Sequence, residues 1–139
     1  MVAYWLIKTE PDHDWSWQEQ VAKGTEGWDG VRNFAARNNI KAMKKGDQAF
    51  FYHSGKERRI MGIVKVVREE YPDKTDSSGR FVMVDVATDR PFKQPVTLKR
   101  IKEEISLANM QLVRISRLSV QSVSKTEWKL VCKLGGVKP

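Results

Sequence analysis

The sequence predicts an α+β fold in which one curved or closed sheet of about five to six short strands is flanked by short helices. Three observations support this. The expected elements run strand, helices, several strands, helix, strand and helix, without the regular alternation of a doubly wound parallel sheet. A chain of 139 residues suits one domain, residues 1–139, with its own core. Its 40% hydrophobic and 30% charged residues are typical of a globular protein rather than a disordered one.

Helix caps and alternating apolar residues predict the individual elements. Ser16 with Glu19 and Ser124 with Glu127 match the capping box, and Asn33 and Thr97 are also cap residues. Helices are therefore expected over residues 17–23, 34–37 with a separate turn at 40–45, 98–104 and 125–134. In residues 80–88 valine alternates with other residues, which indicates a half-buried strand. Further strands are expected over residues 4–8, 48–54, 59–69 and 112–120, and loops at 24–30 and 72–79.

The net charge of +8 is unevenly distributed along the chain. Residues 1–30 hold two lysines against six acids, whereas residues 31–68 hold ten Lys or Arg against two acids. A clustered basic surface attracts phosphate groups through counterion release, so nucleic acid is the expected partner. A merely solvated basic surface is the alternative. No segment combines a basic face with a long apolar one, which argues against a membrane-surface helix.

The densest group of candidate binding residues is WDGVRNFAARN, residues 28–38. Trp28 offers an aromatic face for stacking on a base, and Asn33 and Asn38 offer paired donors and acceptors for a base edge. Arg32 and Arg37 can bind phosphate. Each also has a structural interpretation, with Asn33 as a helix cap, Trp28 in the core and both arginines solvated.

A second candidate group is FFYHSG, residues 50–55. In a strand, Tyr52 and Ser54 share one face and His53 lies on the other. His53 can donate to a base or phosphate, or serve only as a structural hydrogen-bonding group.

Signals for catalysis are weak. The chain has two histidines, which excludes a histidine-rich metal site, and Cys132 falls on a helix face expected to be buried. Lys8, Glu10 and His13 could form an acid–base set, although such residues are more often solvated. We therefore expect no catalytic residue, no metal and no cofactor.

Five segments in chain order resemble the EVE domain and span nearly the whole chain: YWLIKTEP (4–11), WDGVRNFAARNNIKAMKKGD (28–47), FYHSG (51–55), GIVKVVREEYPD (62–73) and RLSVQSVSKTEWKLV (117–131). The resemblance implies a PUA-like fold, a mixed β-barrel flanked by short helices, related to PUA, ASCH and YTH domains. YTH domains hold a methylated base in an aromatic cage, and EVE domains are thought to read modified bases in DNA or RNA. The resemblance thus implies a non-catalytic module that reads a flipped-out, modified base.

Carried onto this chain, the resemblance implies a base pocket with a basic rim. The pocket residues are Trp28, Val31, Asn33, Tyr52, His53 and Ser54. The phosphate-facing rim is Arg32, Arg37, Lys8 and Arg117. The expected edge of the pocket is Glu10, Asn38 and Ser119.

Vertebrate members of the family carry a basic N-terminal tail, whereas this chain begins at its first expected strand. Together with the lack of a signal peptide or of an uncharged apolar run near the roughly 18 residues that span a membrane, this leads us to expect a bacterial cytoplasmic protein. Two other functions remain open. One is an ASCH-like enzyme acting on RNA or a nucleoside, and the other is a protein that binds a small anion or nucleotide.

Overall fold

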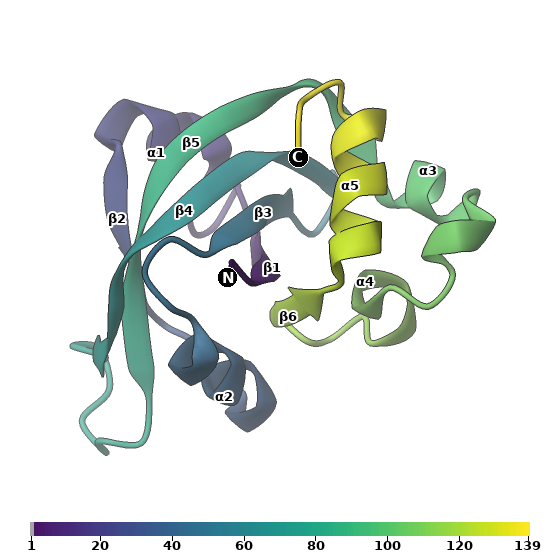
Figure 1. The fold of residues 1–139 in the computed structure, drawn as a ribbon. Coiled ribbons are helices and arrows are strands. Elements are labelled where there is room, and N and C mark those ends of the chain that lie inside the picture. Colours follow the sequence, from purple (N-terminus) through teal and green to yellow (C-terminus); the bar gives the residue numbers. More distant parts are fainter. Residues whose placement is uncertain (1) are drawn as a thin grey trace.

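The computed structural model describes residues 2–139 and shows one six-stranded mixed sheet with helices packed around it (Figure 1). The strands are β1 (Tyr4–Thr9), β2 (Thr25–Trp28), β3 (Gln48–His53), β4 (Arg59–Pro72), β5 (Val82–Thr97) and β6 (Val120–Val123). The helices are α1 (Trp17–Lys23), α2 (Phe34–Ala42), α3 (Leu98–Lys102), α4 (Gln111–Arg114) and α5 (Lys125–Leu134), with a 3₁₀ turn over Ile105–Leu107. The predicted α+β class is confirmed. No helix in the described part of the chain is long and apolar enough to cross a membrane.

The sheet has the strand order β2-β5-β4-β3-β1-β6, with β1 and β3 parallel and the other neighbours antiparallel. As expected, β4 and β5 form a long antiparallel pair, and Val84 and Val86 of the alternating segment are buried. The sheet separates two apolar clusters. Phe51 of β3 belongs to one cluster and Phe50 to the other, because successive strand residues point to opposite faces.

The sheet curves but does not close by hydrogen bonding within residues 2–139, since β2 and β6 are its two edges. Helix α2 packs against both β5 and β6, with Ala36 and Ile40 buried. The side-chain amide of Asn39 donates to the carbonyl of Val120 at 2.7 Å, which ties the helix to β6. The helix therefore packs below the sheet, against its β5 and β6 strands (Figure 1).

Both capping boxes form as predicted. The Ser16 hydroxyl accepts from the backbone N–H of Glu19 at 3.1 Å, and the Glu19 carboxylate accepts from the backbone N–H of Ser16 at 3.0 Å. Ser124 and Glu127 bond in the same way at the start of α5. The buried face of α5 is Trp128, Val131 and Cys132, also as predicted.

Three expectations about the elements are wrong. The expected loop at residues 24–30 contains β2, a short edge strand that has no apolar alternation and is held by pairing with β5. Helix α2 runs through Asn38 and Asn39 without a break. Residues 112–120 are not a strand: helix α4 and a turn precede β6, and the side-chain amide of Gln121 fixes that turn by donating to the carbonyls of Ile115 and Leu118.

Candidate functional site

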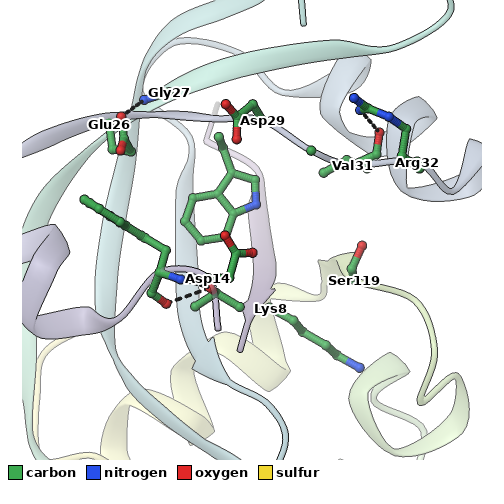
Figure 2. Close-up of a pocket in the computed structure, with 12 residues that line it drawn as sticks. Lys8, Asp14, Glu26, Gly27, Asp29, Val31, Arg32 and Ser119 are labelled. Atoms are coloured by element: carbon green, nitrogen blue, oxygen red, sulfur yellow. Dashed lines mark hydrogen bonds between the residues drawn. The ribbon is translucent and has the colours of Figure 1, made fainter. Parts of the chain in front are cut away.

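A cavity of about 220 Å³, lined by polar and aromatic groups, lies at the edge of the sheet and is here called the Trp28 cavity. Four segments form it: the end of β1, the loop before α1, β2 with the residues after it, and the turn before β6. Its lining is Lys8, Thr9, Asp14, Trp15, Glu26, Gly27, Trp28, Asp29, Gly30, Val31, Arg32 and Ser119. Figure 2 shows Lys8 and Ser119 on one side of the cavity and Asp29, Val31 and Arg32 on the other.

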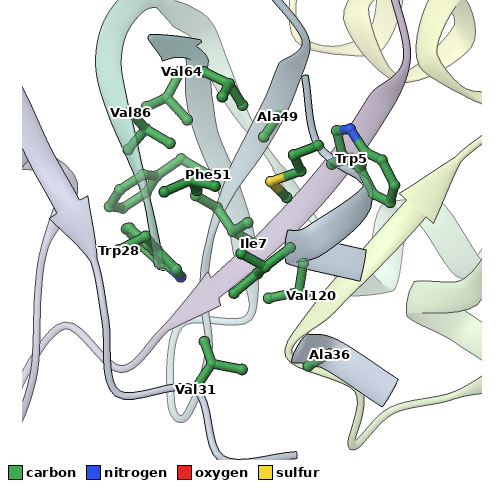
Figure 3. Packing of buried hydrophobic residues seen from close by; sticks show 14 of the residues in the cluster. Trp5, Ile7, Trp28, Val31, Ala36, Ala49, Phe51, Val64, Val86 and Val120 are labelled. Atoms are coloured by element: carbon green, nitrogen blue, oxygen red, sulfur yellow. The ribbon is translucent and has the colours of Figure 1, made fainter. Parts of the chain in front are cut away.

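The cavity has an apolar floor made by Trp28 and Val31. Each side chain is 7% exposed and belongs to the core cluster around Phe51. The Trp28 ring meets the Phe51 ring edge to face, with centroids 5.5 Å apart and planes at 80°, and Figure 3 shows the two side chains together. Trp28 is therefore a core residue that also lines the cavity, and its stacking on a base stays a prediction.

The loop that carries Asp14 and Trp15 is held by hydrogen bonds on its inner side. The Thr9 hydroxyl donates to the Trp15 carbonyl at 2.6 Å and accepts from the Trp15 backbone N–H at 3.2 Å. The Trp15 indole N–H donates to the side chain of Gln20 at 2.9 Å. These bonds place one carboxylate, Asp14, beside the cavity.

Two further carboxylates, Glu26 and Asp29, come from β2 and the residue after it. Glu26 accepts from Lys23 Nζ and from the Gly27 backbone N–H, both at 2.9 Å. Partial burial raises the pKa of Asp29, and the nearby carboxylates of Asp73, Glu26 and Asp14 raise it further. The three acids of the lining are called the acidic wall.

Arg32 lies on the same side of the cavity as Asp29 and is held by a buried aspartate. Its guanidinium donates to Asp73 at 3.1 Å and to the Thr75 hydroxyl at 2.8 Å, and it remains 42% exposed. Burial alone would raise the pKa of Asp73, but hydrogen bonds from Thr75, Gly30 and Arg32 lower it overall. Arg32 is thus a preoriented cation at the mouth of the cavity.

Lys8 forms the other basic side of the cavity. Its ammonium donates to the carbonyl of Ser116 at 2.6 Å, and its backbone N–H donates to the carbonyl of Ser119 at 2.9 Å. Burial lowers the pKa of Lys8. The lysine therefore links β1 to the turn before β6.

The structure brings together five of the residues expected at the site. Trp28, Val31, Arg32, Lys8 and Ser119 line the Trp28 cavity. Tyr52 and Ser54 instead border a neighbouring hollow that Lys8 also lines. Arg117 is exposed in the turn before β6.

The remaining expected site residues make structural contacts outside the cavity lining. The Asn33 side chain caps α2 by accepting from the backbone N–H of Ala36 at 2.9 Å. Arg37 donates to the Asn38 side chain at 2.8 Å and to the Arg80 carbonyl at 3.3 Å. The Glu10 carboxylate accepts from the backbone N–H of Asp12 at 3.1 Å.

His53 is 1% exposed and connects two elements. Its Nε2 accepts from the backbone N–H of Trp17 at 2.9 Å, and its Nδ1 lies 2.8 Å from a Glu57 oxygen. Nε2 is therefore the acceptor, and the ring proton lies on Nδ1 and donates to Glu57. The hydrogen bond from His53 is the main reason why the pKa of Glu57 is lowered.

The sequence interpretation missed the acidic wall. The sequence feature that could have indicated it is the excess of acids in residues 1–30, which hold six acids and two lysines. Glu26 and Asp29 are close in sequence, but Asp14 lies in the loop before α1, so only the folded chain brings all three to one cavity.

The described residues hold few groups for covalent or metal chemistry. Among residues 2–139, no three His, Cys, Asp or Glu side chains are close enough together to hold a metal ion. Burial raises the pKa of the Cys132 thiol to about 11, which leaves it protonated at neutral pH. His13 is exposed and its ring lies 3.9 Å from Glu10, while Lys8 is bonded elsewhere.

Comparison with known proteins identifies relatives over the full length of the chain. Thymocyte nuclear protein 1 of Gallus gallus is 40% identical over 98% of this chain and 70% of its own length. The solution structure of a Rhodopseudomonas palustris protein is 56% identical, with a TM-score of 0.92 over 97% of this chain and 94% of that one. A crystal structure of the human THYN1 protein in complex with 5-methylcytosine containing DNA is 35% identical, with a TM-score of 0.92 and 99% of both chains covered.

A more distant structure shows the fold alone. The ASCH protein of Zymomonas mobilis is 11% identical, with a TM-score of 0.58 over 95% of this chain and 96% of that one. The sequence model of the EVE domain family matches residues 3–134. The full-length relatives and this match lead to one conclusion: the chain belongs to the EVE domain family.

Proposed function

We propose that this protein is a non-catalytic DNA-binding module that holds one flipped-out base, with 5-methylcytosine as the leading candidate, in the Trp28 cavity. The observation that carries the proposal is the combination of an aromatic floor with the acidic wall in one small cavity. The human THYN1 complex with 5-methylcytosine containing DNA supports DNA as the partner. RNA, a bacterial source and a cytoplasmic location stay predictions of the sequence.

The size of the cavity favours a single base. Sites for drug-sized ligands have volumes of about 300–1,000 Å³, and this cavity has about 220 Å³. A base inside a duplex cannot reach such a cavity without leaving the stack, which costs a few kcal/mol. Phosphate contacts from basic residues at the rim, including Arg32, would offset that cost.

The acidic wall favours a base that carries an exocyclic amino group. Carboxylates accept hydrogen bonds from the N4 amino group of cytosine, whereas thymine presents a carbonyl oxygen at the same place. The wall thus selects the base edge, and Trp28 and Val31 supply the apolar surface for the ring and its methyl group.

A binding series with three duplex probes tests this function. The probes are identical except for one Watson–Crick pair, which is 5-methylcytosine with guanine, cytosine with guanine, or thymine with adenine. Burying one methyl group contributes about 0.8 kcal/mol, so the methylated probe should bind about fourfold more tightly than the cytosine probe. A base-edge contact is worth about 1–3 kcal/mol, so thymine should bind about 5- to 150-fold more weakly than 5-methylcytosine. Equal affinity for all three probes would contradict the proposal.

A further inference from the structure

A second hollow of about 300 Å³ lies beside the Trp28 cavity, and Lys8 lines both. A third hollow of about 650 Å³ shares Arg58 and Lys102 with the second. Each hollow therefore shares lining residues with the next. We call the second and third hollows the Tyr52 trough, defined by Lys8, Tyr52, Lys56, Arg58, Lys99 and Lys102.

The trough is strongly basic. Five of its lining residues are Lys or Arg, and the acids in its lining are Glu57 and Glu103. Glu57 is already bonded to the His53 ring and to Arg59 at 3.1 Å. A ligand in the trough therefore meets an excess of cations, which contrasts with the acidic wall of the Trp28 cavity.

Arg58 has an unusual backbone that places it where the two hollows meet. Its φ of 48° is the one positive φ at a non-glycine residue within 2–139. This conformation is unfavourable for a residue with a Cβ, and strained residues of this kind cluster at binding sites. The Arg58 carbonyl accepts from the Leu98 backbone N–H at 2.8 Å, which fixes its main chain, and its Nε donates to the Gly55 carbonyl at 3.1 Å, which orients the exposed side chain.

Tyr52 forms the floor of the second hollow. It is 3% exposed, and the Lys8 ammonium lies 5.8 Å from its ring centroid. Burial raises the pKa of Tyr52 to about 12, so the phenol keeps its proton and can donate to an anionic oxygen at neutral pH. A neutral donor below several cations is a surface suited to phosphate.

We propose that the Tyr52 trough holds the phosphate groups of the DNA strand that adjoins the flipped base, with Arg58 and Lys102 as the main contacts. The proposal rests on the proposed function, because the strand enters the trough from the Trp28 cavity over Lys8. The proposal differs from the sequence expectation, which placed Arg37 among the phosphate contacts. In the structure Arg37 instead bonds to Asn38 and to the Arg80 carbonyl.

The test compares two double variants with the wild-type protein. Arg58→Gln with Lys102→Gln removes two charges from the trough, and Gln at position 58 has no more backbone strain than Arg. Lys129→Gln with Lys133→Gln removes two charges from the exposed side of α5 and is the matched control. Thermal melts of all three proteins establish that they are folded. Affinity for the 5-methylcytosine and cytosine duplexes is then measured at several salt concentrations.

The expected result is a selective loss of phosphate contacts. Each contact contributes about 0.9 to the slope of log affinity against log salt, so the trough variant should lose about two units of slope. In 0.1 M salt this corresponds to about 60-fold weaker binding of both duplexes, with the preference for the methylated base unchanged. The control should lose far less.

Other outcomes separate the two proposals. Suppose that the wild-type protein prefers the methylated duplex. If the trough variant then keeps wild-type affinity, or if both double variants lose affinity equally, the trough proposal is overturned and the proposed function stands. A wild-type protein that binds neither duplex would overturn both.

Discussion

Replacing Asp29 with alanine is expected to weaken recognition of 5-methylcytosine while making the free protein more stable at neutral pH. Asp29 lies on the acidic wall, with Asp14 and Glu26 in the same lining. A hydrogen bond to a charged group contributes about 1.5–3 kcal/mol, so its loss should weaken binding of the methylated duplex about 10- to 150-fold. The thymine duplex has no amino group to lose, so the preference between the two probes should shrink.

The effect on stability has the opposite sign. Burial and the neighbouring carboxylates raise the folded-state pKa of Asp29 above the ordinary 3.8. The folded state then binds more protons than the unfolded state, so this residue costs stability as pH rises from 3.8 through the raised value. Above that range the cost is fully present, and the alanine variant should melt at a higher temperature than the wild type. Below pH 3.8 the difference should vanish.

Titrations of both duplexes and melting curves across pH measure the two effects on the same samples. Asp12→Ala is the control, because Asp12 is exposed in the same N-terminal region but does not line the cavity. Unchanged binding of the methylated duplex by Asp29→Ala would refute a contact between the carboxylate and the base. A lower melting temperature at neutral pH would refute the repulsion within the acidic wall.

The other predictions concern residues that the sequence placed in the pocket. Trp28→Ala should lower the free energy of unfolding by about 3–5 kcal/mol because it empties part of the core. Trp28→Phe should stay folded but lose affinity and selectivity for the methylated duplex. If Trp28→Phe keeps its full affinity and selectivity, Trp28 is a core residue only. Asn33→Ala should cost about 1 kcal/mol of stability through the lost helix cap and leave base preference unchanged, which melts and titrations check together. His53→Ala should cost about 1–3 kcal/mol in urea unfolding because it leaves the buried Trp17 N–H unpaired, and a variant as stable as the wild type would contradict this role.

Much of the fold could be predicted because many of its signals are local. A capping box depends on groups within one helical turn, so Ser16 with Glu19 and Ser124 with Glu127 located α1 and α5 correctly. The alternating valines of β5 report burial on one face, which is also a short-range pattern. In contrast, β2 has no such pattern and forms because β5 offers its backbone groups for pairing.

The candidate site likewise has residues that the sequence indicated and residues that only the folded structure brings together. The segment WDGVRNFAARN pointed to Trp28 and Arg32, and the family resemblance added Val31; all three line the cavity, whereas Asn33, Arg37 and Asn38 of the same segment do not. The acidic wall and the basic trough could not be found in this way. Asp14 and Asp29 meet only after the sheet forms, and Arg58 reaches Lys102 only through the pairing of β4 with β5.

The sequence by itself determined most of the secondary-structure elements, the family resemblance and the basic character of the chain. The tertiary structure decided how the charges are used. It divides the basic segment, joining Arg32 to Asp73 at one rim and directing Lys56 and Arg58 to the trough at the other. The physical reason is that caps and alternation depend on near neighbours, whereas a binding surface depends on strand pairing between residues far apart in the chain.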